Sequence, residues 1–221
     1  MASSPFMSGK ISIPAELFKT AGAPSGGVVV IAHGSDGLNE PWLTLMRQFA
    51  TDLAGSGLVA LMPKYFASTP ETKAGMDAMT AIGVQLPKWQ ATVADAVTHA
   101  RTLAGGPSAR VGLLGFSLGG HICLRLRVQA QALVSFFAPE LTGIGSSAAT
   151  PFAQIHHGLS DQIKFSQAES IAHVLNTEGT ATELYMYPGA GHGFGSSSPA
   201  DKTALDASKE RTLKFFVRRL G

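Results

Sequence analysis

Short, continuous apolar runs alternate with helix-length amphipathic stretches along this chain, and that rhythm leaves few folds open. The runs are of strand length, and in most of them apolar residues do not alternate with polar ones. Such continuous apolar runs are typical of strands that are buried on both faces of a sheet. They are Val28–Ala32, Leu58–Met62, Val111–Leu114, Ala132–Phe137, Phe152–His156 and Glu183–Tyr187. The alternation therefore predicts an α/β fold whose mostly parallel, doubly wound sheet is flanked by helices.

Amphipathic segments follow most of these runs, and we expect them to be helices. The expected helices are Pro41–Ala54, Pro87–Leu103, Leu118–Val128, Ile163–Asn176 and Pro199–Leu220. Residues 10–19 are expected to supply one or two short edge strands. No internal repeat or linker interrupts the 221 residues, so we expect a single domain, 1–221.

The segment Pro63–Pro87 is long for a plain loop. Met76, Met79 and Ile82 stand at helical spacing within it, which predicts a short helix over the edge of the sheet. Because the segment follows the carboxyl end of a strand, it is also placed to form a wall of a binding site. Both interpretations stay open from the sequence.

Composition excludes several classes of protein. Hydrophobic residues make up 45% of the chain and charged residues 14%, which argues against disorder. Seventeen basic against 15 acidic residues is too balanced for nucleic-acid binding, and no apolar run reaches the roughly 20 residues of a membrane span. The lone cysteine, Cys123, cannot form an internal disulfide. Since Met1–Lys10 lacks the pattern of a secretory signal, we expect a cytoplasmic protein.

One serine stands where a strand gives way to a helix. Residues 115–120 read Gly-Phe-Ser-Leu-Gly-Gly, directly after the run Val111–Leu114. A glycine-flanked serine between a strand and a helix is the nucleophile elbow, in which the hydroxyl stands above the sheet. The start of the helix also directs free N–H groups toward that hydroxyl. We therefore predict that Ser117 is a nucleophile.

A serine nucleophile needs a base, and the base needs a carboxylate partner. His192 lies in the glycine-rich loop after the last strand, where site residues gather. Asp161 follows the penultimate strand and is the favoured partner, with Glu140, one strand earlier, as the alternative. The chain order Ser117, Asp161, His192 is that of the α/β-hydrolase triad.

Stabilising the tetrahedral intermediate takes two preset donors. We expect one to be the N–H of Leu118 and the second to come from the loop 33–37, with Ser35 favoured and Gly34 or Asp36 as alternatives. Apolar contacts to substrate are expected from a set of large side chains, each of which is equally compatible with a place in the core. These are Phe66, Met76, Met79, Trp89, Phe116 and Phe194.

The remaining histidines and the cysteine are expected to have other roles. His99 and His173 fall on helices and are expected to face solvent, whereas His121 is expected to pack or cap. His156 and His157 are adjacent and lack companion ligands, so no metal site and no cofactor are expected. Cys123 is six residues past Ser117 and is expected to pack in the core.

Taken together, these motifs resemble an α/β-hydrolase of the dienelactone hydrolase family from Val28 through Leu220. The resemblance rests on residues 28–34, 61–65, 115–120, 157–161 and 191–194. It implies an eight-stranded type of core without a large lid domain, and a shallow active site at the carboxyl edge of the sheet.

Three positions depart from that family. Its dienelactone hydrolases use a cysteine nucleophile where this chain has Ser117, and a glutamate that controls the thiol where this chain has Gly34. Their arginine for the substrate carboxylate, four residues after the histidine, corresponds here to Ser196. The departures favour a conventional serine esterase over a hydrolase of lactone acids.

The sequence therefore predicts a hydrolase of small carboxylic esters, with thioesters or lactones also open, that forms an acyl-serine intermediate. The alternatives are a small-peptide amidase and a non-catalytic ligand-binding protein on the same scaffold. The basic residues of the last helix, from Lys209 to Arg219, are interpreted as a solvated face opposite an apolar stripe. We expect a monomer or small homo-oligomer.

Overall fold

The computed structural model describes residues 1–20, 27–141, 143–145, 150–195 and 197–221. Within these residues, eight strands form one sheet in the order β1-β4-β6-β5-β7-β8-β9-β10. Its strands are β1 (Ala2–Ser3), β4 (Ala15–Phe18), β5 (Gly27–Ala32), β6 (Val59–Pro63), β7 (Arg110–Phe116), β8 (Ala132–Phe136), β9 (Phe152–Gly158) and β10 (Ala181–Tyr187). β6 to β10 run parallel to β5, whereas β1 and β4 pair antiparallel at one edge. The mostly parallel sheet expected from the apolar runs is confirmed.

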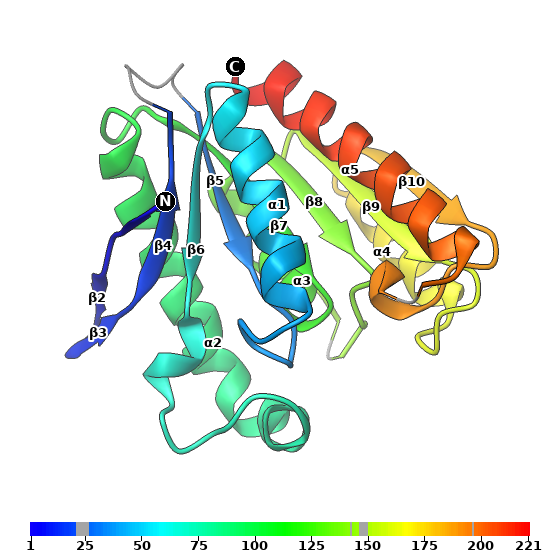
Figure 1. Ribbon diagram of the computed structural model, residues 1–221, viewed down its shortest axis with the longest axis horizontal. Coiled ribbons are helices and arrows are strands. Elements are labelled where there is room, and N and C mark those ends of the chain that lie inside the picture. Colours follow the sequence, from blue (N-terminus) through cyan, green and yellow to red (C-terminus); the bar gives the residue numbers. More distant parts are fainter. Residues whose placement is uncertain (21–26, 142, 146–149, 196) are drawn as a thin grey trace.

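Helices cover both faces of the sheet (Figure 1). α1 (Trp42–Gly55) and α5 (Pro199–Leu220) lie on one face, and α2 (Met76–Leu103), α3 (Leu118–Arg125) and α4 (Phe165–Thr177) lie on the other. Short 3₁₀ turns occur at η1 (Tyr65–Ser68), η2 (Arg127–Gln129) and η3 (His192–Phe194). None of the described helices is both long and apolar enough to span a membrane.

The two faces of β5 show why the apolar runs are continuous. Val28 and Val30 pack with α2 and α3 on one side, whereas Val29 and Ile31 pack with α1 and α5 on the other. All four are buried, as expected when successive side chains point to opposite, equally dry faces. A polar residue at any of these positions would lose its hydration without gaining a partner.

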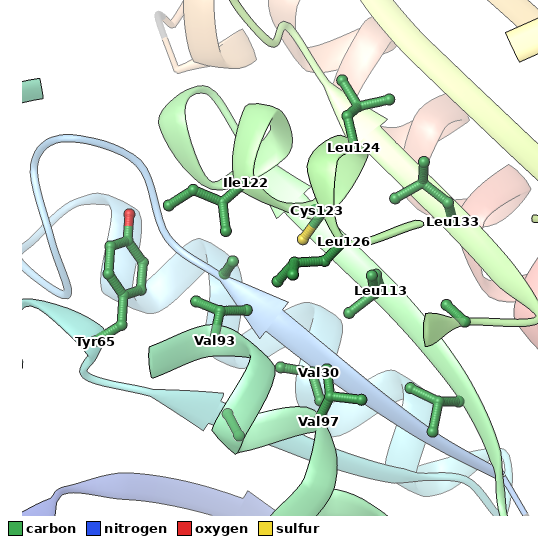
Figure 2. Packing of buried hydrophobic residues seen from close by; sticks show 14 of the residues in the cluster. Val30, Tyr65, Val93, Val97, Leu113, Ile122, Cys123, Leu124, Leu126 and Leu133 are labelled. Atoms are coloured by element: carbon green, nitrogen blue, oxygen red, sulfur yellow. The ribbon is translucent and has the colours of Figure 1, made fainter. Parts of the chain in front are cut away.

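Cys123 belongs to the first of these two cores. Cys123 packs in the same buried cluster as Val30, Leu113 and Leu126 (Figure 2), and it is itself fully buried. Burial raises the pKa of the thiol well above its usual range because the charged form loses its solvation. A packing role therefore explains this residue, as expected.

The long segment after β6 differs from the expectation in one respect. A single helix, α2, begins at Met76 and continues through Pro87, where two helices were expected. A proline inside a helix removes one backbone hydrogen bond. Burial of Leu86 and Trp89 on either side of it offsets that loss.

The N-terminus also holds more strand than expected. β4 and β3 (Ile11–Ile13) fall in the predicted region 10–19. Two further strands escaped prediction: β1, which is only two residues long and pairs with β4, and β2 (Phe6–Ser8), which forms a separate hairpin with β3. Strands this short carry no readable periodicity.

Candidate active site

Ser117 occupies a sharp turn between β7 and α3. Its φ of 52° lies in the left-handed region, which few residues other than glycine adopt, so the turn holds the serine in a strained conformation. The glycines around it permit the close packing that this turn needs. A Cβ on Gly119 would lie 2.2 Å from the carbonyl oxygen of Ala32, and one on Gly115 would lie 2.4 Å from the carbonyl oxygen of Gly119.

His192 and Asp161 reach the same edge of the sheet from two loops. The Nε2 atom of His192 is 3.2 Å from the Ser117 hydroxyl oxygen, and its Nδ1 atom is 2.9 Å from Oδ2 of Asp161. The Asp161 carboxylate is fully buried and also accepts the backbone N–H of Ile163 at 2.7 Å, which fixes its orientation. Three side chains that are far apart in the sequence thus form one hydrogen-bonded chain.

Glu140, the alternative partner, lies elsewhere. Its side chain accepts the hydroxyl of Ser170 at 3.2 Å, and its backbone N–H donates to the side chain of Gln167 at 2.7 Å. Both contacts bind it to α4. Asp161 is therefore the carboxylate that contacts His192.

The other histidines have structural surroundings. His33, His121 and His156 are buried, and burial lowers the pKa of His33 and of His121 to about 4 and that of His156 to about 3, because a buried imidazolium loses its hydration. The His156 ring stacks on Phe136 and contacts the Tyr187 hydroxyl at 2.7 Å.

The two helix histidines differ from each other. His173 is exposed on α4, as expected. His99 is half-buried instead, because its ring stacks on Phe6 and contacts the Ser4 hydroxyl at 3.0 Å. The β2–β3 hairpin that covers it was not foreseen from the sequence.

Two backbone amides at the cavity are placed to act as donors. Leu118 is the first residue of α3, directly after Ser117, and Ser35 lies in the loop after β5. Both residues line the cavity described below. Within the part of the chain that the structure describes, neither amide has a hydrogen-bond partner. Gly34 faces the serine: a Cβ there would lie 3.3 Å from Cβ of Ser117. A larger side chain at this position would therefore crowd the hydroxyl.

A cavity of about 320 Å³ opens above Ser117. Its walls come from the loop after β5, from α1, α2 and α3, and from the loops after β8, β9 and β10. The apolar lining residues are Trp42, Leu45, Met46, Met79, Ile82, Phe116, Leu118, Phe137, Pro139, Leu141 and Ile163. Met79 and Ile82 show that the segment after β6 is both a helix and a wall of the cavity.

The predicted substrate contacts need correction. Phe116 lines the cavity, but Phe66, Trp89 and Phe194 pack into the cores instead, and Met76 faces solvent on α2. Trp89 is fully buried and donates its indole N–H to the Thr69 hydroxyl at 2.8 Å. The proposed arginine counterpart, Ser196, lies outside the described residues.

Trp42 and Phe137 are cavity residues that the sequence analysis missed. Phe137 directly follows β8, and its ring lies 4.9 Å from that of His192, so its position at a strand end was the available signal. Trp42 packs on the loop of His192: a Cβ on Gly193 would lie 2.2 Å from its indole, and one on Gly195 would lie 2.4 Å from it. The same indole also lines a second cavity beside Phe194 and Lys202.

These features define the class of protein. A serine at a strained strand–helix turn, facing a histidine and an aspartate at the carboxyl edge of a mostly parallel sheet, is the arrangement of an α/β-hydrolase. The sequence profile of the dienelactone hydrolase family matches residues 13–220. The chain belongs to the dienelactone hydrolase family, and with it to the carboxylic ester hydrolases.

Solved structures share this fold at low sequence identity. A dienelactone hydrolase-like promiscuous phosphotriesterase from metagenomic libraries is 20% identical with a TM-score of 0.78, and 100% of this chain aligns with 98% of that one. An esterase from Thermogutta terrifontis, solved with propionate bound, is 18% identical (TM-score 0.74; 98% and 93% covered). Dienelactone hydrolase from Anabaena variabilis is 19% identical (TM-score 0.72; 100% and 98% covered). Comparison with curated protein sequences gives no match.

Proposed function

We propose that this protein is a serine esterase that cleaves small carboxylic esters through an acyl-Ser117 intermediate. The observation that carries the proposal is the continuous chain from the Ser117 hydroxyl through His192 to the buried Asp161 carboxylate. A hydroxyl is a weak nucleophile until a base takes its proton, and the imidazole is within reach of that proton. The cavity of apolar side chains around the serine suits an ester rather than a charged or polymeric substrate.

The roles of the residues follow from their positions. The Ser117 hydroxyl oxygen forms a bond to the ester carbonyl carbon while His192 Nε2 takes the hydroxyl proton. The carbonyl oxygen becomes an oxyanion, which accepts hydrogen bonds from the N–H groups of Leu118 and Ser35. His192 then returns the proton to the leaving alcohol. A water molecule, deprotonated in the same way, attacks the acyl-serine and releases the acid. Asp161 accepts a hydrogen bond from the Nδ1–H group of His192, which orients the ring and stabilises the imidazolium.

Replacing the nucleophile tests the proposal. We expect Ser117→Ala to lower kcat/KM for 4-nitrophenyl acetate at least about 10³-fold, because no other group would form the acyl intermediate. The exposed serine Ser166 on α4 supplies the control: Ser166→Ala should retain the rate. Activity of Ser117→Ala within tenfold of the parent would exclude the serine as nucleophile.

Covalent labelling separates an esterase from a ligand-binding protein on the same scaffold. A fluorophosphonate should add its phosphonyl group to the peptide that holds Ser117, with displacement of fluoride, and mass spectrometry would locate the adduct. An unlabelled Ser117 under conditions that label a known serine hydrolase would favour a non-catalytic protein.

A further inference from the structure

The charges around the cavity indicate which esters it accepts. Among its described lining residues, Asp36 is the one acidic residue, and none is lysine or arginine. The residues that the structure leaves undescribed also contain no lysine or arginine, since 21–26, 142, 146–149 and 196 read as Ala, Gly, Pro, Ser and Thr only. Within this chain, the cavity therefore has no cation to neutralise a substrate carboxylate.

The Asp36 side chain carries an uncompensated charge at the cavity. It is exposed, and it counts as one negative charge in the formal charge of the chain at pH 7. No ion pair to it is found among the residues that the structure describes. Its loop is fixed nonetheless, because the Asp36 carbonyl accepts the Asn39 side-chain N–H at 2.7 Å and the Ser35 carbonyl accepts the N–H of Gly75 at 2.7 Å.

An acyl chain on Ser117 must lie against this lining. The acyl group stays bonded to the serine after the alcohol leaves, so the walls beside Ser117, including Phe116, Phe137 and Ile163, have to accommodate it. Moving a carboxylate from water into apolar surroundings is costly unless a cation or several donors meet it. The carboxylate of Asp36, which also lines the cavity, adds repulsion between its charge and that of the substrate.

We propose that the site selects esters with an uncharged, apolar acyl chain and rejects esters whose acyl chain ends in a carboxylate, with Asp36 as a determinant of that rejection. The inference rests on the proposed esterase function and names its substrate class. It separates this chain from hydrolases that hold an acidic substrate by a cation.

Three esters of equal reactivity test the selection. They are 4-nitrophenyl hexanoate, the mono-4-nitrophenyl ester of adipic acid, and its monomethyl ester, in which the same chain is neutral. We expect kcat/KM for the hexanoate to exceed that for the adipate at least about 100-fold, and the monomethyl adipate to recover most of this difference. Adipate turnover equal to that of the hexanoate would overturn the proposal.

Variants then identify the residue responsible. In Asp36→Asn, the ratio of hexanoate to adipate kcat/KM should fall at least about threefold at low ionic strength. Asp206→Asn removes the same charge from an exposed position on α5 that lines neither cavity and should leave the ratio unchanged. In 0.5 M salt the parent ratio should fall toward that of Asp36→Asn. A ratio that is the same in Asp36→Asn as in the parent would exclude Asp36 as the determinant.

Binding distinguishes failure of this inference from failure of the proposed function. Dissociation constants of Ser117→Ala for the 4-nitroanilides of the same three acids require no turnover. If none of the esters shows Ser117-dependent hydrolysis, the esterase proposal is refuted. The selection would still be supported if the two neutral anilides bind more tightly than the acidic one and if Asp36→Asn reduces this difference in dissociation constant. Equal binding of the three anilides would refute it.

Discussion

Acid should destabilise this protein well above the pH at which its carboxylates protonate, because three histidines are buried in neutral form. His33, His121 and His156 are each almost fully inaccessible, and burial lowers their pKa to about 4, 4 and 3. In the unfolded chain their pKa returns to about 6.5. Between those values the unfolded state binds more protons than the folded state. The contribution of these three histidines to the free energy of unfolding is therefore present above about pH 6.5 and is lost as the pH falls toward their folded pKa values.

The size of the loss follows from the two sets of pKa values. At pH 5 each histidine lowers the free energy of unfolding by about 2 kcal/mol relative to pH 7.5, so the three together remove about 6 kcal/mol. This figure is insensitive to the folded values, since any folded pKa well below 5 gives nearly the same loss. A loss of this size is a large share of the free energy of unfolding of an ordinary domain, which is about 5–15 kcal/mol.

Urea unfolding at several pH values between 7.5 and 5 measures the effect. The midpoint should fall steeply below pH 6.5 while the m-value stays constant. His156→Gln should remove about a third of the pH dependence, whereas Gln in place of the exposed His173 on α4 should leave the dependence unchanged. A free energy of unfolding that varies by less than about 1 kcal/mol over this range would refute the reasoning.

Two further substitutions probe the candidate site and the scaffold. Asp161→Asn should lower kcat for 4-nitrophenyl acetate about 10⁴-fold, because an amide favours the wrong tautomer of His192. Glu140→Gln, which alters the carboxylate bound to α4, should keep kcat within a few-fold of the parent. A larger loss of kcat in Glu140→Gln than in Asp161→Asn would instead identify Glu140 as the partner of His192. Arg127→Met should lower the free energy of unfolding by about 3–5 kcal/mol, because the fully buried guanidinium pairs with Glu178 at 2.6 Å. Chemical denaturation measures this loss, and a change below about 1 kcal/mol would argue against it.

Much of the fold and the candidate triad is readable from the sequence, for a physical reason. β5 is buried on both faces, so its residues 28–32 had to be continuously apolar. Parallel strands bring their carboxyl ends to one edge, so residues placed just after β7, β9 and β10 are neighbours whatever lies between them. Ser117, Asp161 and His192 were identified by this position, and the structure brings them into contact.

The cavity wall was less readable because it depends on how a helix is rotated and where it begins. Met79 and Trp89 both lie on α2 and are both large and apolar, yet the first lines the cavity and the second fills the core. The helix was expected to begin at Pro87, so its first three turns, which carry Met79 and Ile82, were assigned to a separate short helix. Phe194 was expected at the cavity because it lies in the same turn as His192, but its side chain is buried and packs in the core.

Two side chains are shared by the cavity around Ser117 and the second cavity beside it. Trp42 and Leu45 of α1 line both the site around Ser117 and the second cavity, which reaches Phe194 and Lys202. Smaller side chains at these two positions would enlarge both spaces toward each other without moving a strand or a helix. The length of acyl chain that fits, and the access of an acidic chain end to the Lys202 ammonium group, are thus controlled by two side chains of one helix.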